Sequence, residues 1–303
     1  MIRRFEREGT VWVDIENPSG DDVEAVMQEF HLPAELGKEL LSPTEKPRVD
    51  RYPNAVYAVF HFPATRHTHE KDMSYELDVT LGAGFLITTH YRPMDAVDDL
   101  ARSLEAAILL KRTDSLTAPF LFLELAERLY RASEGELDAL EAEVIRIEGE
   151  LFSGRERQMV GAISRASREL LTHKRILGNH ADTLAALEGA AGPVLGESGK
   201  ECVRGVDKLY ARAYRRALAM SDIVDELRDT NTALLGTRQN EIMKNLTIIT
   251  ATMLPLSLLA NIFSMNTRVL PIAGAQQDFW IIILIMVAVT VAFALYFKLK
   301  KWF

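Results

Sequence analysis

The sequence predicts an α/β domain, a long stalk helix and two C-terminal transmembrane helices. Strand-like runs separated by turn signals occupy the first 90 residues. Helical periodicity dominates the middle of the chain, and two long apolar stretches follow near its C-terminal end. With 303 residues, the chain is long enough for two domains at roughly 100–200 residues each.

The N-terminal part, residues 1–115, is predicted to be the α/β domain. Strands are expected at residues 10–15, 55–62, 75–81 and 84–90. The Gly82-Ala83-Gly84 segment connects the last two strands as a hairpin turn. Asn17-Pro18-Ser19 predicts a capped helix at about 20–30.

The middle of the chain is predicted to be helical. Residues 116–200 are expected to form antiparallel helices that break near Ser153-Gly154. The small-residue stretch GAAGPVLGESG (189–199) is expected to be a loop before the stalk helix, 201–241. Because no Pro interrupts 203–254, the stalk can continue into the membrane, and sixty helical residues would span about 90 Å.

The last apolar stretch, residues 279–297, predicts a transmembrane helix. It has nineteen residues without a charge, which as a helix matches the roughly 30 Å hydrocarbon core of a bilayer. Trp280 and Trp302 bracket it as interfacial aromatics, and KLKK at 298–301 begins a basic tail, 298–303. The alternative at this length is a buried core helix.

The preceding stretch, residues 242–263, predicts a first and more polar span. Pro255 is tolerated in a membrane helix when neighbouring groups satisfy the freed carbonyl. The basic tail favours a cytoplasmic C-terminus, so two spans place residues 1–240 in the cytoplasm as well. Only the outer loop, 264–278, faces outward, which predicts a multi-pass protein of the cell (inner) membrane.

A heptad seam of small and polar residues follows the predicted stalk and first span. Steps of four and three give Asp229, Ala233, Gly236, Asn240, Met243, Thr247, Thr250, Leu254, Ser257 and Asn261. A ring of such helices would line a wet passage, which Met243 and Leu254 would narrow. Small and hydroxyl residues also permit close helix packing in membranes, and the spacing leaves both interpretations open.

Composition and motifs exclude several function classes. A formal net charge of −8 argues against a nucleic-acid partner, because phosphate binding needs clustered Lys and Arg. The lone Cys202 excludes an internal disulfide, and residues 1–10 lack the apolar core of a signal peptide. No nucleophile–base arrangement is found in the sequence, so we do not expect an enzyme.

The residues around the first span resemble those of the CorA family of divalent metal cation (magnesium/cobalt) channels. The similar segments are NEIMKNLTIITATMLPLSLLANIFSMN (240–266), WVDIENPS (12–19), PRVDRYPNAVYAVF (47–60), LGAGFLITTH (81–90) and the terminal KLKKWF. The resemblance covers essentially the whole chain. It implies a funnel-shaped homopentamer in which five stalk helices form the pore and the second span lies outside them.

The resemblance also implies a selectivity filter just after the first span. The family has a Gly-Met-Asn signature there, and this chain has Ser264, Met265 and Asn266. Asn261 replaces a usual Gly, which adds a possible second amide ring. The outer loop holds Arg268 and a single acid, so it would attract cations weakly. These departures bear on ion selectivity.

A regulatory metal site is the second implication of the resemblance. In that family, carboxylates of neighbouring subunits share a metal ion that holds the pore closed. The candidates here are Glu70 and Asp72 facing Asp207 on the stalk, with solvated surface charges as the alternative. Asp229, on the seam, could form a carboxylate ring that concentrates cations at the inner mouth.

The expected activity is uptake of Mg²⁺, with Co²⁺ or Ni²⁺ as substitutes. The expected partners are other copies of the chain, the lipid bilayer and the transported divalent cation, and no resident cofactor is implied. Two alternatives follow from Ser264 and Asn261: a ZntB-like zinc transporter, and a membrane-anchored metal sensor or scaffold that does not conduct.

Overall fold

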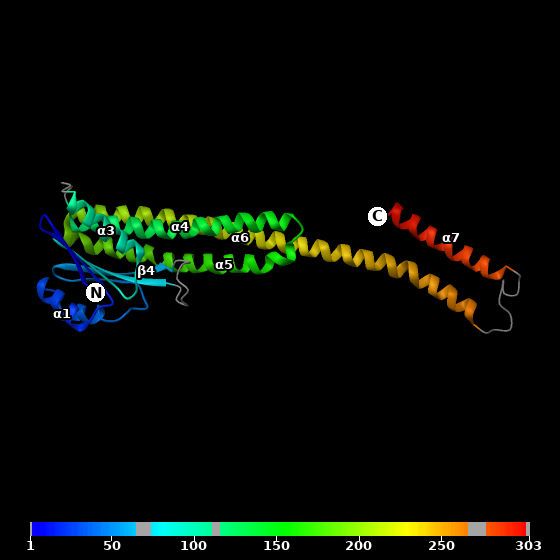
Figure 1. Ribbon diagram of the computed structural model, residues 1–303, viewed down its shortest axis with the longest axis horizontal. Coiled ribbons are helices and arrows are strands. Elements are labelled where there is room, and N and C mark those ends of the chain that lie inside the picture. The colour runs from blue at the N-terminus through cyan, green and yellow to red at the C-terminus, as the bar shows by residue number, and fades with distance from the viewer. Residues whose placement is uncertain (1, 65–73, 111–115, 266–276, 301–303) are drawn as a thin grey trace. The chain divides into compact units, whose positions relative to one another are not determined.

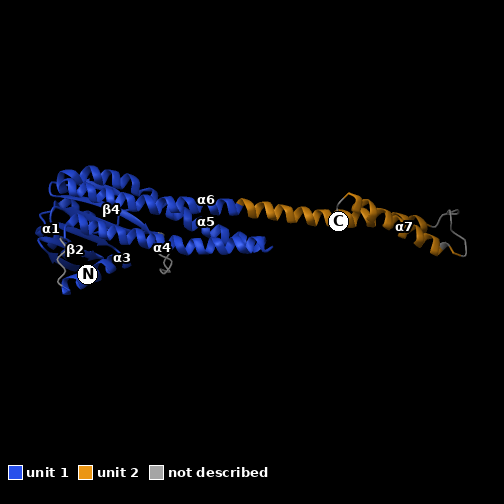
Figure 2. Ribbon diagram, turned by 90° about the horizontal axis from the view of Figure 1, so that it is seen from above, with its two compact units in different colours: residues 1–228 blue, residues 229–303 orange. Residues whose placement is uncertain are grey.

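The computed structural model describes residues 2–64, 74–110, 116–265 and 277–300. The chain divides into two compact units, Met1–Arg228 and Asp229–Phe303, coloured separately in Figure 2. Each unit is described by itself below. The boundary between them falls within one helix, α6, so the same element contributes to both units.

A six-stranded mixed sheet lies at the N-terminal end of unit 1. Its strands are β1 (Ile2–Arg7), β2 (Thr10–Glu16), β3 (Arg48–Arg51), β4 (Ala55–Pro63), β5 (Ser74–Gly82) and β6 (Phe85–His90). The order is β1-β2-β6-β5-β4-β3, and only the β2–β6 pair is parallel. The four strands predicted from sequence are confirmed. The two edge strands, β1 and β3, were not expected.

Two short helices cover one face of the sheet. Helix α1 (Gly20–Glu29) starts at a capping box, in which the Ser19 hydroxyl accepts from the Asp22 amide and the Asp22 carboxylate accepts from the Ser19 amide. Helix α2 (Ala34–Glu39) follows. Their apolar side chains pack with Tyr57 and neighbouring strand residues in a small core.

Four longer helices form the other layer (Figure 1). They are α3 (Asp95–Leu109), α4 (Ala118–Phe152), α5 (Glu156–Gly178) and the first part of α6 (His180–Ser264). Their side chains join Trp12 and the opposite face of β4, β5 and β6 in the larger core. Helices α4 and α5 carry buried residues along most of their length, so each packs against other helices along that length and is not surrounded by solvent.

The break predicted at 189–199 is present but shorter than expected. The residues on either side of Gly196 are helical, and Gly196 itself leaves helical geometry, with φ 70° and ψ −161°, so the element labelled α6 consists of two helices joined by a kink. A positive φ of this kind suits glycine because it has no Cβ. The Arg204 and Glu188 side chains pair at 2.7 Å and the rings of His180 and Tyr210 lie 6.1 Å apart, so the chain reverses direction at Gly196 before the stalk helix.

Unit 2 contains the C-terminal part of α6 and helix α7 (Asp278–Leu299). Both helices are long and apolar enough to cross a membrane. Only 6% of the residues in the apolar window of α6 and 0% in that of α7 are buried within the chain. A core helix of a soluble protein would be mostly buried, so these surfaces need lipid or another chain as a partner.

Candidate functional site

The seam residues of α6 lie on its exposed surface in the described chain. Asp229, Ala233, Asn240, Met243, Thr247, Thr250, Leu254, Ser257 and Asn261 are exposed, and Gly236 is half-buried. The two large apolar members stay uncovered, Met243 at 53% and Leu254 at 64% exposure. After Lys244, α6 carries no further charged residue, so these polar groups are set in an otherwise apolar helix.

The threonine hydroxyls of the seam have a defined orientation. Thr247 Oγ1 donates to the Met243 carbonyl at 2.8 Å, and Thr250 Oγ1 donates to the Leu246 carbonyl at 2.9 Å. Because each hydroxyl proton is used within the helix, the oxygen lone pairs are what the seam presents. Oxygen lone pairs are the ligands that Mg²⁺ and its hydration shell prefer.

The predicted filter lies only partly within the described residues. Ser264 ends α6, and its hydroxyl donates to the Asn261 carbonyl at 3.0 Å. The backbone bends at Met265, directly after α6. The Met265 amide donates to the Ile262 carbonyl at 3.3 Å, and its side chain is 56% exposed. Asn266 lies outside the described residues. The end of α6 therefore brings the hydroxyl of Ser264 and the backbone of Asn261 together.

The predicted regulatory carboxylates lie only partly within the described residues. Glu70 and Asp72 lie outside the described residues, and Asp207 is exposed on α6 in unit 1. Among the described residues, no group of three or more His, Cys, Asp or Glu side chains could hold a metal ion. A metal site at Asp207 would need ligands from elsewhere, such as a second subunit.

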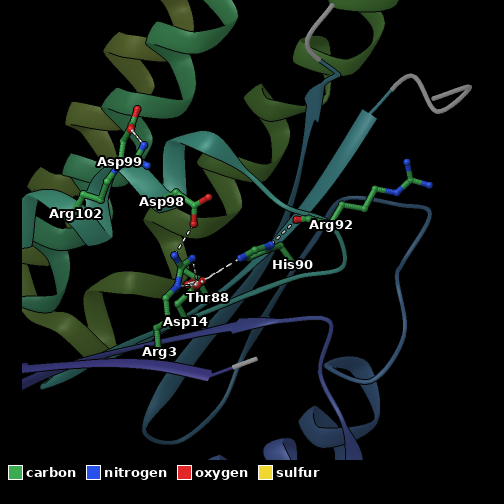
Figure 3. A network of polar contacts seen from close by, with 8 residues as sticks. All are labelled: Arg3, Asp14, Thr88, His90, Arg92, Asp98, Asp99 and Arg102. Atoms are coloured by element: carbon green, nitrogen blue, oxygen red, sulfur yellow. Dashed lines mark hydrogen bonds and ion pairs between the residues drawn. The ribbon is translucent and has the colours of Figure 1, made fainter. Parts of the chain in front are cut away.

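A buried polar cluster that sequence reasoning missed joins β1, β2, β6 and α3 (Figure 3). We call it the Asp14 cluster: Asp14, Arg3, Thr88 and His90. Arg3 donates to Asp14 Oδ2 through Nη2 at 2.7 Å and Nε at 3.1 Å, and Thr88 Oγ1 donates to Asp14 Oδ1 at 2.6 Å. His90 Nε2 lies 3.3 Å from Asp14 Oδ1, and Arg3 also pairs with Asp98 on α3.

The charges of the Asp14 cluster stabilise one another. Burial raises the pKa of Asp14, but the hydrogen bonds and charge of His90, with Thr88 and Arg3, outweigh it and hold that pKa below its usual value. Burial lowers the pKa of His90, and Asp14 outweighs that, so the His90 pKa is raised. The cluster therefore links β1, β2, β6 and α3 through ionised side chains.

A second cluster lies on the opposite face of the sheet. We call it the Asp78 cluster: Asp78, Glu76, Tyr57 and Tyr91. Asp78 is fully buried, and Tyr91 donates to its Oδ2 at 3.3 Å. Among the described residues, neither its Oδ1 nor the Tyr57 hydroxyl has a partner at hydrogen-bonding distance, although the Tyr57 hydroxyl is close enough to lower the pKa of Asp78. The sequence signal for the two clusters is an acidic residue, Asp14 or Asp78, inside an otherwise apolar strand at 10–16 or 74–82. That signal does not show which side chains contact each acid.

Comparison with known proteins finds one family over nearly the whole chain. A family model described as CorA-like Mg²⁺ transporter protein matches residues 7–300. The cobalt/magnesium transport protein CorA of Methanocaldococcus jannaschii is 22% identical over 303 residues, covering 98% of this chain and 93% of that protein. Its Thermotoga maritima counterpart is 23% identical over 303 residues, covering 96% of this chain and 83% of that protein.

A solved structure agrees with this match. The complete structure of the CorA magnesium transporter from Methanocaldococcus jannaschii aligns with a TM-score of 0.83. The alignment covers 99% of this chain and 93% of that one, at 20% identity. At this identity the match shows a shared fold, including the α/β domain, the long helix and the C-terminal apolar helix.

Proposed function

Because the chain belongs to the CorA family, we propose that it forms a channel that carries divalent metal cations across a membrane, with Mg²⁺ as the main ion taken up and Co²⁺ or Ni²⁺ as substitutes. One observation carries the proposal. The polar seam of α6 is exposed on a helix that is otherwise apolar and free of charge beyond Lys244. Polar groups in a membrane helix are costly unless they face water or protein.

The channel is a homopentamer in this proposal. Five copies of α6 turn their seams toward one axis, and α7 lies outside them against lipid. The hydroxyl oxygens of Thr247, Thr250 and Ser257 then face the passage as acceptors, which suits a cation that keeps its water. Met243 and Leu254 narrow the passage and can gate it by dewetting.

The remaining parts of the proposal concern topology and ion control. Both termini lie in the cytoplasm, because Lys298, Lys300 and Lys301 follow α7. Ser264, Met265 and Asn266 form the outer filter. Asp229 concentrates cations at the inner mouth, and Glu70 and Asp72 of one subunit share a regulatory ion with Asp207 of the next.

Flux into liposomes tests the proposal. Vesicles that hold a Mg²⁺-sensitive dye and vesicles that hold a Zn²⁺-sensitive dye are compared in parallel. Magnesium entry that depends on the protein is expected. Zinc entry without magnesium entry would support the ZntB-like alternative, and no flux of either ion would support the non-conducting sensor or scaffold.

A filter variant sharpens this test. Asn266→Ala should reduce magnesium flux by roughly ten-fold or more, because the amide oxygens that meet the hydrated ion are lost. Asn245→Ala removes an amide from α6 at a position off the seam, directly after Lys244, and flux should persist. Cross-linking of both variants checks that the oligomer is intact. Unchanged flux in Asn266→Ala would remove Asn266 from the filter.

A further inference from the structure

Asp78 is a buried carboxyl group that has no cationic partner among the described residues. It projects from β5 on the same sheet face as its cross-strand neighbour Val59, toward the small core beneath α1 and α2. It is fully buried, and within the described part of the chain its Oδ1 accepts no hydrogen bond. An isolated charged carboxylate in such a place is too costly to persist, so the group must be neutral or be paired.

The described charged and titratable groups around Asp78 form no ion pair with it. They are Tyr57 and His61 on β4, Glu76 on β5, Tyr91 and Arg92 after β6, Glu39 on α2 and Arg48 on β3. The guanidinium of Arg48 lies near this site but is paired elsewhere. It pairs with Glu39 at 2.9 Å and Asp50 at 3.0 Å, and stacks over the Tyr57 ring at 5.6 Å. Among the described residues, Asp78 has no ion pair.

A second carboxylate, that of Glu76, lies next to Asp78 and already accepts hydrogen bonds from other groups. Glu76 is two residues away on the same face of β5. Both of its oxygens accept the Thr44 amide, at 2.7 and 2.8 Å, and its Oε2 lies 3.4 Å from His61 Nε2. Two adjacent carboxylates in one closed site disfavour double ionisation. The proton therefore belongs on Asp78, which lacks such donors.

We propose that Asp78 is a proton-binding switch in unit 1: it holds a proton at neutral pH and releases it as the pH becomes alkaline. Burial, followed by the charge of Glu76, raises the pKa of Asp78 to about 8, which agrees with this assignment. A cavity of about 530 Å³ is lined by Glu76, Tyr91 and His61, and Tyr91 contacts Asp78 Oδ2, so this cavity reaches the edge of the Asp78 cluster. The proposal does not depend on transport.

Release of the proton changes contacts that reach the start of α6. The new charge repels Glu76 and weakens the contacts of Glu76 with Thr44 and His61. His61 also links this site to α6, because its carbonyl accepts His180 Nε2 at 2.7 Å. Burial lowers the pKa of His180 to about 4, so its ring is neutral, donates through Nε2 and accepts the Tyr130 hydroxyl at Nδ1.

Infrared titration of the full-length protein in detergent measures the proton directly. The carbonyl stretch of a protonated carboxyl group should be present at pH 7 and lost as the pH rises toward about 10, about two units above the pKa. Asp78→Asn should remove it. Glu76→Gln should keep it at pH 7 and lower its titration midpoint, because the repelling charge is gone. A band that is absent at pH 7, or that Glu76→Gln removes and Asp78→Asn does not, overturns the assignment.

Hydrogen exchange tests the consequence of proton release. The Thr44 amide, which donates to Glu76, should lose protection by roughly ten-fold between neutral and alkaline pH, beyond the intrinsic base-catalysed rise. Amides of β2 serve as the internal reference for that rise. In Asp78→Asn the extra loss should disappear. Equal loss in both proteins would show that ionisation of Asp78 does not control this contact, and the switch would be rejected.

Discussion

Asp14 and Asp78 are two fully buried carboxyl groups on opposite faces of one sheet. The cost of burying a charged carboxylate is met in different ways at the two sites. Asp14 is ionised, since Arg3, Thr88 and His90 surround its two oxygens. Asp78 has one hydroxyl donor at 3.3 Å and an unpartnered oxygen beside another carboxylate. The pKa of Asp14 is accordingly lowered, whereas that of Asp78 is raised.

The difference shows that burial alone does not decide the charge of an acid. Desolvation is the largest single influence on the pKa of both groups and raises both. At Asp14, the imidazole of His90 on β6 and the guanidinium of Arg3 on the edge strand β1 outweigh desolvation, so the pKa is lowered. The Asp14 cluster therefore stays ionised and stabilises the fold, whereas the Asp78 cluster can change its charge near physiological pH.

Removing the charge of Asp14 should produce the largest effect. Asp14→Asn leaves Arg3 and His90 facing a neutral amide and should cost about 2–4 kcal/mol, near the range for breaking buried ion pairs. This corresponds to a fall of roughly 5–15 °C in the unfolding midpoint of unit 1. Trp12 fluorescence, with Trp280 and Trp302 replaced by Phe, reports it because Trp12 Nε1 donates to Thr88 at 3.0 Å. An unchanged midpoint would contradict the assigned role of Asp14.

The pH dependence of unfolding should separate the two acids. An acid with a lowered folded pKa stabilises above its unfolded pKa, so the Asp14 contribution is lost only as the pH falls below about 4. An acid whose folded pKa is raised stabilises the fold at low pH, and this stabilisation is lost as the pH rises. The Asp78 contribution is present below about pH 4 and is lost as the pH rises to about 8.

Asp78→Asn should therefore flatten the stability profile between about pH 6.5 and about pH 8, with an effect on the order of a few kcal/mol at most. At lower pH His180 adds a slope of the opposite sign, because its folded pKa is lowered to about 4 and stability is gained as the pH rises toward its unfolded pKa. His90 adds to the loss above about pH 6.5, because its raised pKa gives stability that is present at low pH and lost as the pH rises through the folded pKa, and His90→Gln should remove that part. A wild-type stability that rises between about pH 6.5 and about pH 8 would refute the account of Asp78.

Much of the fold could be predicted from local pattern. Strands β2, β4, β5 and β6 are rich in apolar and β-branched residues, Ser19 and Asp22 cap α1, and the apolar spans exceed the length of ordinary core helices. The edge strands β1 and β3 were missed because they read IRRFER and RVDR, which carry too little apolar signal. The break predicted at 189–199 is confined to Gly196, because the helices on either side, one of them buried at Ala191, extend further than the composition indicates.

The candidate site was predictable where it follows helical spacing. The seam can be read from the sequence because Thr247, Thr250 and their neighbours recur every three or four residues. The charge states of Asp14 and Asp78 could not be read in this way. They depend on Arg3 from an unexpected strand and on contacts such as the one between Glu76 and Thr44, which are 32 residues apart.

Removing one hydroxyl from the Asp78 cluster should have a smaller effect than neutralising either acid. The Tyr91 hydroxyl donates to Asp78 Oδ2 and lowers its pKa, so Tyr91→Phe should shift the alkaline infrared midpoint upward, by up to about one pH unit. The loss of stability should be about 1 kcal/mol. Tyr214→Phe on α6 is the matched control, and its midpoint should equal that of the wild type. A downward shift in Tyr91→Phe would mean that the hydroxyl does not stabilise the anion.

The smallest effect should come from an ion pair that lies beside the Asp14 cluster but faces solvent. Arg102 contacts Asp99 one turn away on α3, and both side chains are more than half exposed, at 70% and 58% (Figure 3). Exposed pairs gain little because water already solvates each charge. Asp99→Asn should therefore leave the unfolding midpoint of unit 1 and its pH profile unchanged in the Trp12 fluorescence assay. A shift as large as that of Asp14→Asn would mean that local charge density, and not burial of the carboxylate, makes the Asp14 cluster important.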